Sequence, residues 1–152
     1  RQPHDHNRDY TDAPRYAAVR ALTAQVAAWR GELAQVLDLH CPWIRGEGDE
    51  HIYLYDAPAP WYAAQVRFMD ALEAGLTGPY RFARARNPQW DSRGNGPSPT
   101  CAHWFRHHTP VWTANSLEFP YALADGLPVT AAGARAFGRD VGWAVREFIQ
   151  QR

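Results

Sequence analysis

Apolar residues recur at steps of three and four along three segments of the chain, a spacing typical of helices with one buried face. The first helix is predicted from Asp12, its N-cap, to residues 31–33. The second is predicted between the prolines at 58–60 and the glycines at 75–78, and the third after the N-cap Thr130. Their apolar faces are, in chain order, Val19, Leu22, Val26, Trp29 and Leu33; Trp61, Gln65 or Val66, Phe68, Met69, Leu72 and Leu76; and Ala134, Phe137, Val141, Val145 and Phe148.

Short runs of apolar and β-branched residues between these helices predict strands. They span Val36–His40, which reads as a buried strand, His51–Tyr55 and Thr113–Phe119, the last strand of the chain. Residues 45–50 predict a solvated turn, and residues 79–112 a long loop packed by its aromatic side chains. Helices that alternate with strands indicate an α/β layer architecture, and residues 1–152 fit a single domain.

The charge balance narrows the classes of partner. The chain carries 16 basic and 16 acidic residues, and its basic residues are scattered arginines. No net field therefore draws it to a nucleic acid or a membrane surface. No apolar stretch approaches the ~20 residues that span a bilayer. We expect neither nucleic acid nor membrane as a partner.

The chain has two cysteines, Cys41 and Cys101, too few for a disulfide framework. They could pair with each other. The simpler interpretation is that Cys41 is a small buried residue next to His40.

Two polar residues end predicted strands. His40 closes the strand Val36–His40, and Glu118 lies between apolar neighbours in the strand Thr113–Phe119. The carboxyl ends of strands face the crevice in which α/β sheets hold their ligands. An imidazole there is either a metal ligand or a satisfied core residue. A carboxylate with apolar neighbours is either desolvated for general-base work or paired with an arginine.

A third polar group lies near the start of the chain, where Asp5, Asn7 and Arg8 follow one another closely. A guanidinium grips a carboxylate with two hydrogen bonds, and an adjacent amide can donate a further one. The segment is therefore either an anchor for a carboxylate ligand or a solvated polar loop.

The order of these motifs resembles the zinc metallocarboxypeptidases, the carboxypeptidase A-like family. In that family an Asp-x-Asn-Arg segment precedes a helix, a buried strand ends in a zinc-binding histidine, and a later strand carries the catalytic glutamate before a last long helix. The matching segments here are Asp5-His6-Asn7-Arg8, Leu39-His40-Cys41-Pro42-Trp43 and Leu117-Glu118-Phe119-Pro120. The resemblance covers nearly all of the chain but only the later half of the family's catalytic domain. It implies a mixed-sheet, three-layer α/β fold that is incomplete at its N-terminus.

The resemblance also implies a role for each residue. His40 would be a ligand of one zinc ion, and Glu118 the general base that takes a proton from zinc-bound water. Asn7 and Arg8 would hold the free C-terminal carboxylate of a peptide. Asp5 would orient a second ligand by a hydrogen bond. The chain would then belong to a hydrolase that releases C-terminal residues from peptides.

Parts of the family pattern are absent from the sequence. Its first two zinc ligands come from a His-x-x-Glu motif, which does not occur here, so they are expected upstream of Arg1. The arginine that polarises the scissile carbonyl is also missing. Residues 91–113 contain no mobile tyrosine, and Tyr80 is a weak substitute. In the family this loop lines the specificity pocket. Its basic residues could favour an acidic or polar side chain, or form a solvated basic turn, which is the simpler interpretation: His103, Arg106, His107 and His108.

Three alternatives stay open. An acyl-amino-acid deacylase on the same fold would use the same carboxylate anchor, and a non-catalytic binding module would have lost the metal. A separate metal site of His4, His6 and His40 is compatible with their spacing. For the 152-residue chain alone we expect weak or no zinc binding and no peptidase activity. We also expect association through a sheet edge left open by missing strands.

Overall fold

Helices and strands alternate along the chain, as the apolar pattern predicts. The computed structural model describes residues 4–42, 49–87 and 100–151. The elements in chain order are η1 (His6–Arg8), α1 (Ala17–Ala28), β1 (Leu33–His40), β2 (Tyr53–Leu54), α2 (Tyr62–Gly75), η2 (Arg84–Arg86), α3 (Cys101–His108), β3 (Val111–Glu118), β4 (Leu123–Ala124), β5 (Leu127–Pro128) and α4 (Ala131–Gln150).

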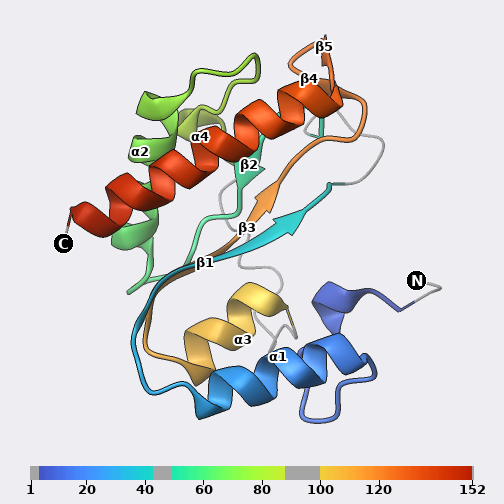
Figure 1. The fold of residues 1–152 in the computed structure, drawn as a ribbon, viewed down its shortest axis with the longest axis vertical. Helices are drawn as coiled ribbons and strands as arrows, with labels where there is room; N and C mark the ends of the chain where they lie inside the picture. The colour runs from blue at the N-terminus through green and yellow to red at the C-terminus, as the bar shows by residue number, and fades with distance from the viewer. Residues whose placement is uncertain (1–3, 43–48, 88–99, 152) are drawn as a thin grey trace.

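The central sheet is mixed and lies between two layers of helices. Its strand order is β1-β3-β2, with β1 parallel and β2 antiparallel to β3. Figure 1 shows α2 and α4 on one side of β1 and β3, and α1 and α3 on the other. The prediction of an α/β layer architecture is confirmed at this level.

Each face of the sheet packs into its own apolar core. On the α2 and α4 side, Phe68, Phe148 and Leu117 are buried in the larger core. On the α3 side, Phe105 and Ala114 belong to a smaller core that also includes Val36 of β1. The even-numbered residues near the end of β3 therefore face α3, because successive side chains of a strand point to opposite faces.

The long C-terminal helix begins where its N-cap was predicted. The Thr130 hydroxyl accepts a hydrogen bond from the Gly133 amide at 3.1 Å, and the Thr130 amide donates to the Tyr80 hydroxyl at 2.7 Å. Asp140, on the same helix, accepts from the Thr77 hydroxyl at 2.6 Å. Most of the predicted apolar stripe of α4 lies against the core. The prediction for this helix is confirmed.

The first helix is shorter than predicted. It spans Ala17–Ala28, and the exposed Asp12 does not cap it. The amides of Arg15 and Tyr16 donate instead to the Asp9 carboxylate, at 3.0 and 2.9 Å. Trp29 is 56% exposed, so it is not part of a buried face as predicted. Asp9 thus holds the residues that precede the helix, and no side chain among the described residues caps the helix itself.

The predicted strands lie where expected, but their surroundings differ. The strand that ends at His40 was predicted to be buried, whereas β1 is an edge strand of the described sheet and its Leu39 is 72% exposed. The strand ending at Glu118 is not the last, because the hairpin of β4 and β5 follows it. Neither cysteine forms a disulfide, and Cys41 is exposed rather than buried.

The loop predicted over residues 79–112 contains α3, a helix that the sequence analysis missed. Residues 88–99 of that loop lie outside the described residues, as do residues 43–48, which cover most of the predicted turn at 45–50.

Three glycines of α4 provide a matched test of the packing between this helix and Tyr80. A Cβ on Gly133 would overlap the Tyr80 phenol, whereas a Cβ on Gly138 or Gly142 would have no neighbour within 4 Å. We expect Gly133→Ala to lower the free energy of unfolding by about 1–3 kcal/mol, the usual cost of overpacking. Gly138→Ala and Gly142→Ala should raise it by about 0.5–1 kcal/mol through helix propensity. Urea denaturation of the three variants measures these differences, and equal effects at all three positions would contradict the packing.

Candidate active site

Three polar side chains form a row at one end of the sheet. His40, the last residue of β1, is in register with Glu118, the last residue of β3. Tyr53 of β2 is in register with Glu118 from the opposite side. Residues in register project from the same face of a sheet, so the imidazole, the carboxylate and the phenol occupy neighbouring positions. The two strand-end residues singled out from the sequence are adjacent, and Tyr53 is a third that the sequence analysis missed.

A second polar pair lies one step behind this row. Asp38 and Ser116 are in register, and the Ser116 hydroxyl donates to Oδ2 of Asp38 at 2.9 Å. Nδ1 of His40 lies 3.9 Å from the same oxygen, too far for a hydrogen bond but close enough for electrostatic attraction. Within the described residues the His40 ring has no hydrogen bond, so its lone pair is available to a metal ion or a proton.

Glu118 is a desolvated carboxylate. Its side chain is 4% exposed, and Oε2 has no hydrogen-bond partner in the described part of the chain. Burial raises the pKa of Glu118 above that of an ordinary glutamate. The positive charge of His40 lowers this pKa, the carboxylates of Asp38 and Asp49 raise it, and Arg8 lowers it slightly, so burial prevails. Two roles were left open for Glu118, a general base or the partner of an arginine. An unpartnered oxygen and a raised pKa are more typical of the general base.

Tyr53 closes the row on the β2 side. The residue is 5% exposed, and burial is the main reason that its pKa is raised. A hydrogen bond with Tyr55 and the negative charge of Glu118 raise that pKa further. Tyr53 therefore stays a neutral phenol across the physiological pH range, a group that can both donate and accept a hydrogen bond.

The segment with Asp5, Asn7 and Arg8 is ordered by its own side chains. Oδ1 of Asp5 accepts from the Asn7 amide at 2.9 Å and caps η1. Oδ1 of the buried Asn7 accepts from the Cys101 amide at 2.8 Å, at the start of α3. A backbone amide can only donate, so this contact identifies the oxygen of Asn7 and leaves its NH2 group as the donor. The solvated-loop interpretation is wrong for Asn7.

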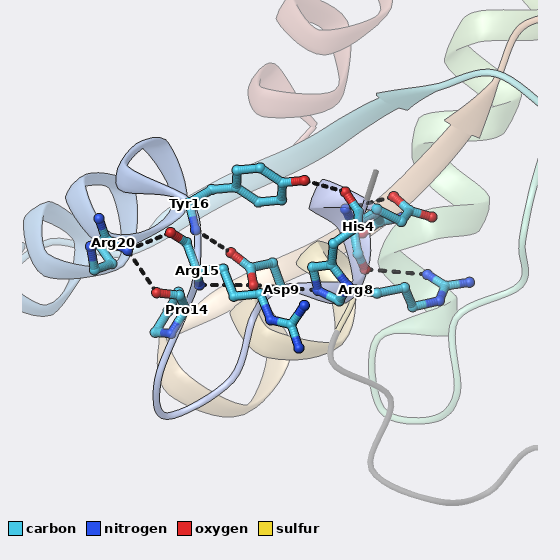
Figure 2. A network of polar contacts seen from close by, with 9 residues as sticks. His4, Arg8, Asp9, Pro14, Arg15, Tyr16 and Arg20 are labelled. Carbon is cyan, nitrogen blue, oxygen red and sulfur yellow. Dashed lines mark hydrogen bonds and ion pairs between the residues drawn. The ribbon is translucent and has the colours of Figure 1, made fainter. Parts of the chain in front are cut away.

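Arg8 is exposed, and its guanidinium is held at the surface of this segment. Its Nη1 donates to the Asn7 carbonyl at 3.2 Å, and its charge acts on Glu118. Figure 2 shows the Arg8 side chain directed away from Tyr16 and the start of α1. Arg8 thus lies within electrostatic reach of the row at the sheet end, with the remaining donors of its guanidinium facing outward.

Asp9 fastens this segment to α1. Burial alone would raise its pKa, but the hydrogen bonds from the Tyr16 and Arg15 amides, together with the charges of His4 and Arg15, outweigh that effect and lower it. Nε2 of His4 lies 3.4 Å from Asp9, and the Tyr16 hydroxyl donates to the His4 carbonyl. Figure 2 shows these contacts as one network. Asn7 and Arg8, which precede Asp9, are therefore positioned by contacts with the start of α1 as well as with α3.

The donor set fits part of a zinc site. A catalytic zinc needs three protein ligands, and within residues 4–42, 49–87 and 100–151 no group of three histidine, cysteine, aspartate or glutamate side chains could hold a metal ion. His40 supplies one imidazole, and the unpartnered oxygen of Glu118 lies beside it. The rings of His4 and His6 both flank Tyr16, at centroid distances of 6.1 and 3.6 Å, so the alternative site of His4, His6 and His40 is not formed.

Tyr80 does not match the mobile tyrosine of the family. It is 2% exposed, and its hydroxyl donates to the Pro128 carbonyl at 3.1 Å while it accepts from the Thr130 amide. A phenol fixed in the core in this way cannot swing over a substrate.

Comparison with protein-family models and with curated protein sequences finds no match to this chain. None of the helices in the described residues is long and apolar enough to cross a membrane.

The buried charge of Glu118 predicts a stability that depends on pH. Below the pKa of an unfolded glutamate the side chain is protonated in both states, so Glu118→Gln should then change the free energy of unfolding little. As the pH rises past that value, the unfolded chain loses its proton while the folded chain resists ionisation, and the native protein is destabilised. We therefore expect Glu118→Gln to raise the melting temperature at pH 7–8 and not at pH 3–4. Thermal denaturation across this range, with Glu147→Gln at the half-buried carboxylate that pairs with Arg146 as control, measures the difference. A stabilisation equal at all pH values would contradict it.

Proposed function

We propose that this chain is the C-terminal part of the catalytic domain of a zinc-dependent hydrolase of the metallocarboxypeptidase type. The observation that carries the proposal is the register of His40 with Glu118 at the ends of adjacent parallel strands, with an unpartnered, desolvated oxygen on Glu118. A metal-ligating side chain beside a strong base is the pair that hydrolysis by activated water requires. The substrate would be a peptide with a free C-terminal carboxylate.

His40 would be one of the zinc ligands, and the other ligands would come from residues that precede Arg1. When bound, the metal supplies a water whose pKa is lowered toward ~7. Asp38 attracts positive charge on the His40 ring without engaging it in a hydrogen bond. The negative charge of Asp38 would therefore stabilise a cation bound by the imidazole while leaving the lone pair of the ring accessible.

Glu118 would move the proton. Because its pKa is raised by burial, the carboxylate is a better proton acceptor than an exposed glutamate. It would take a proton from the attacking water and pass that proton to the nitrogen of the leaving amino acid. Tyr53, a neutral phenol in the same row, would shield the Glu118 carboxylate from bulk water on the side of β2.

Asn7 and Arg8 would orient the substrate. The Asn7 NH2 group is left as a donor because its oxygen is committed to the Cys101 amide. The Arg8 guanidinium lies on the same segment, within electrostatic reach of Glu118. A carboxylate bound by both groups would place the adjacent amide bond close to the base.

Zinc content and substrate hydrolysis by the full-length protein that contains this chain test the proposal. We expect one chelator-sensitive zinc ion per molecule and release of the C-terminal residue from N-blocked dipeptides, but no cleavage of the same peptides with an amidated C-terminus. Glu118→Gln should lower kcat by about 10²–10⁴-fold, the usual contribution of a general base. His40→Gln should lower the zinc content. Glu147→Gln, a half-buried carboxylate on α4 that pairs with Arg146, should leave both quantities unchanged.

Arg8→Gln should separate binding from chemistry. Because Arg8 would act on the substrate carboxylate and not on the reacting atoms, we expect KM to rise by roughly 10-fold or more with a smaller change in kcat. Steady-state kinetics with the same dipeptides measures both constants, and Arg20→Gln on α1 is the matched control. An equal response of Arg8→Gln and Arg20→Gln would remove Arg8 from the binding site.

The same measurements separate the competing classes. Hydrolysis of N-acyl amino acids but not of peptides would replace the peptidase by an acyl-amino-acid deacylase, which needs the same carboxylate anchor. Absence of both zinc and turnover in the full-length protein would identify a binding module instead.

A further inference from the structure

We propose that a basic cluster on α3, made of His103, Arg106 and His107, binds the negatively charged side chain of the residue that is released. The protein would then prefer C-terminal glutamate or aspartate. This inference rests on the proposed function, because it assigns the substrate class of the same site. It replaces the solvated basic turn that the sequence suggested for these residues.

Arg106 is the centre of the cluster. Its Nε donates to the Ala114 carbonyl of β3 at 3.0 Å, which holds the guanidinium against the sheet. Burial lowers the pKa of Arg106 to about 10, so the group is partly withdrawn from water. Within the described residues no carboxylate forms an ion pair with it. A guanidinium that is partly buried without an anion is costly, and a bound anion would relieve that cost.

The two histidines add ring nitrogens beside Arg106 that can donate hydrogen bonds. His103 and His107 are one turn apart on α3, and their ring centroids lie 4.4 Å apart. Burial lowers the pKa of His103, and the charges of His107 and Arg106 lower it further. The ring of His107 also rests edge-on against Trp61, at a centroid distance of 5.5 Å. The cluster therefore has three groups that can donate hydrogen bonds to an anion, and the Trp61 ring lies beside them.

The position of the cluster links it to Glu118. Helix α3 packs against β3 and β1 on the face that carries Ala114, and Glu118 lies on that same face four residues further along β3. Four residues of strand span about 13 Å. Because α3 turns directly into β3, it runs back along the strand, as Figure 1 shows. His103 therefore lies about 4.5 Å closer to the Glu118 end than Arg106 does.

The anchor for the C-terminal carboxylate meets the same helix. Asn7 binds the amide of Cys101, the first residue of α3. A residue held between Asn7 and Glu118 therefore lies at the start of α3, and its side chain can extend along the helix toward His103 and Arg106. A side-chain carboxylate suits this position, because Arg106 presents a fork of donors that matches carboxylate geometry.

Isosteric substrates isolate the effect of the side-chain charge. We would compare N-blocked dipeptides that end in Glu and Gln, which differ in charge but hardly in shape, on the full-length zinc protein. We expect kcat/KM to be at least 10-fold higher for Glu. Arg106→Met should reduce the Glu/Gln ratio by about 10- to 100-fold, whereas Arg106→Lys should retain part of the preference. Arg135→Met, an exposed arginine on α4 in the opposite helix layer, should leave the ratio unchanged.

Binding gives a readout that does not depend on turnover. In the full-length Glu118→Gln variant, calorimetric titration with Gly-Glu and Gly-Gln should show tighter binding of Gly-Glu, and the additional Arg106→Met should abolish the difference. Circular dichroism of each Arg106 variant shows whether it is folded, and Arg106→Lys carries the test if Arg106→Met does not fold. If the protein hydrolyses peptides and kcat/KM is equal or higher for the dipeptide that ends in Gln, the acidic subsite is overturned while the proposed function stands. Tighter binding of Gly-Glu without hydrolysis of any peptide would overturn the proposed function and leave the subsite in place.

Discussion

The parallel pairing of β1 with β3 is the interaction on which the rest of the structure depends. It fixes His40 opposite Glu118 and Asp38 opposite Ser116 on one face of the sheet, and directs Leu117 into the core beneath α2 and α4. A slip of one residue would turn Glu118 into that apolar core. The core therefore enforces the register of the polar row, because burying Leu117 is favourable and burying a carboxylate among phenylalanines is not.

The polar row is stable only because the surrounding contacts hold it in place. Glu118 lacks a partner for one buried oxygen, which is unfavourable for folding. The larger core and the Asp9 network compensate from either side of the row, and the Asn7 contact fastens the N-terminal segment to α3. Unfavourable burial of this kind persists in proteins where it serves chemistry, since an acid–base residue needs a shifted pKa. The favourable contacts of the surrounding residues thus offset the unfavourable burial of the unpartnered Glu118 oxygen.

The sequence predicts those parts of the structure that depend on local patterns. Helix α4 has a periodic apolar face and a threonine N-cap, and both are confirmed. Helix α1 was predicted too long because the residues before it, Arg15 and Tyr16, are held by Asp9, a contact between residues six and seven positions apart. Helix α3 has only eight residues, too few for its apolar positions to establish a helical period. His40 and Glu118 could be selected as strand ends, but Tyr53 joins them only through the antiparallel register of β2, which no local pattern encodes.

The row at the sheet end is closed on one side and open on the other, which gives the proposed site a direction. Tyr53 is buried and blocks the β2 side, whereas His40 lies on β1, whose outer edge has no partner strand in the described residues. Leu39, its neighbour, is largely exposed along that edge. Further metal ligands would therefore approach from the β1 side, where exposed strand groups also favour added pairing. The substrate would then lie over η1 and the start of α3, which Asn7 joins, with its anchored carboxylate near Arg8 and its side chain toward Arg106. Metal and specificity would in this way lie on opposite flanks of Glu118, so either flank could change without altering the base.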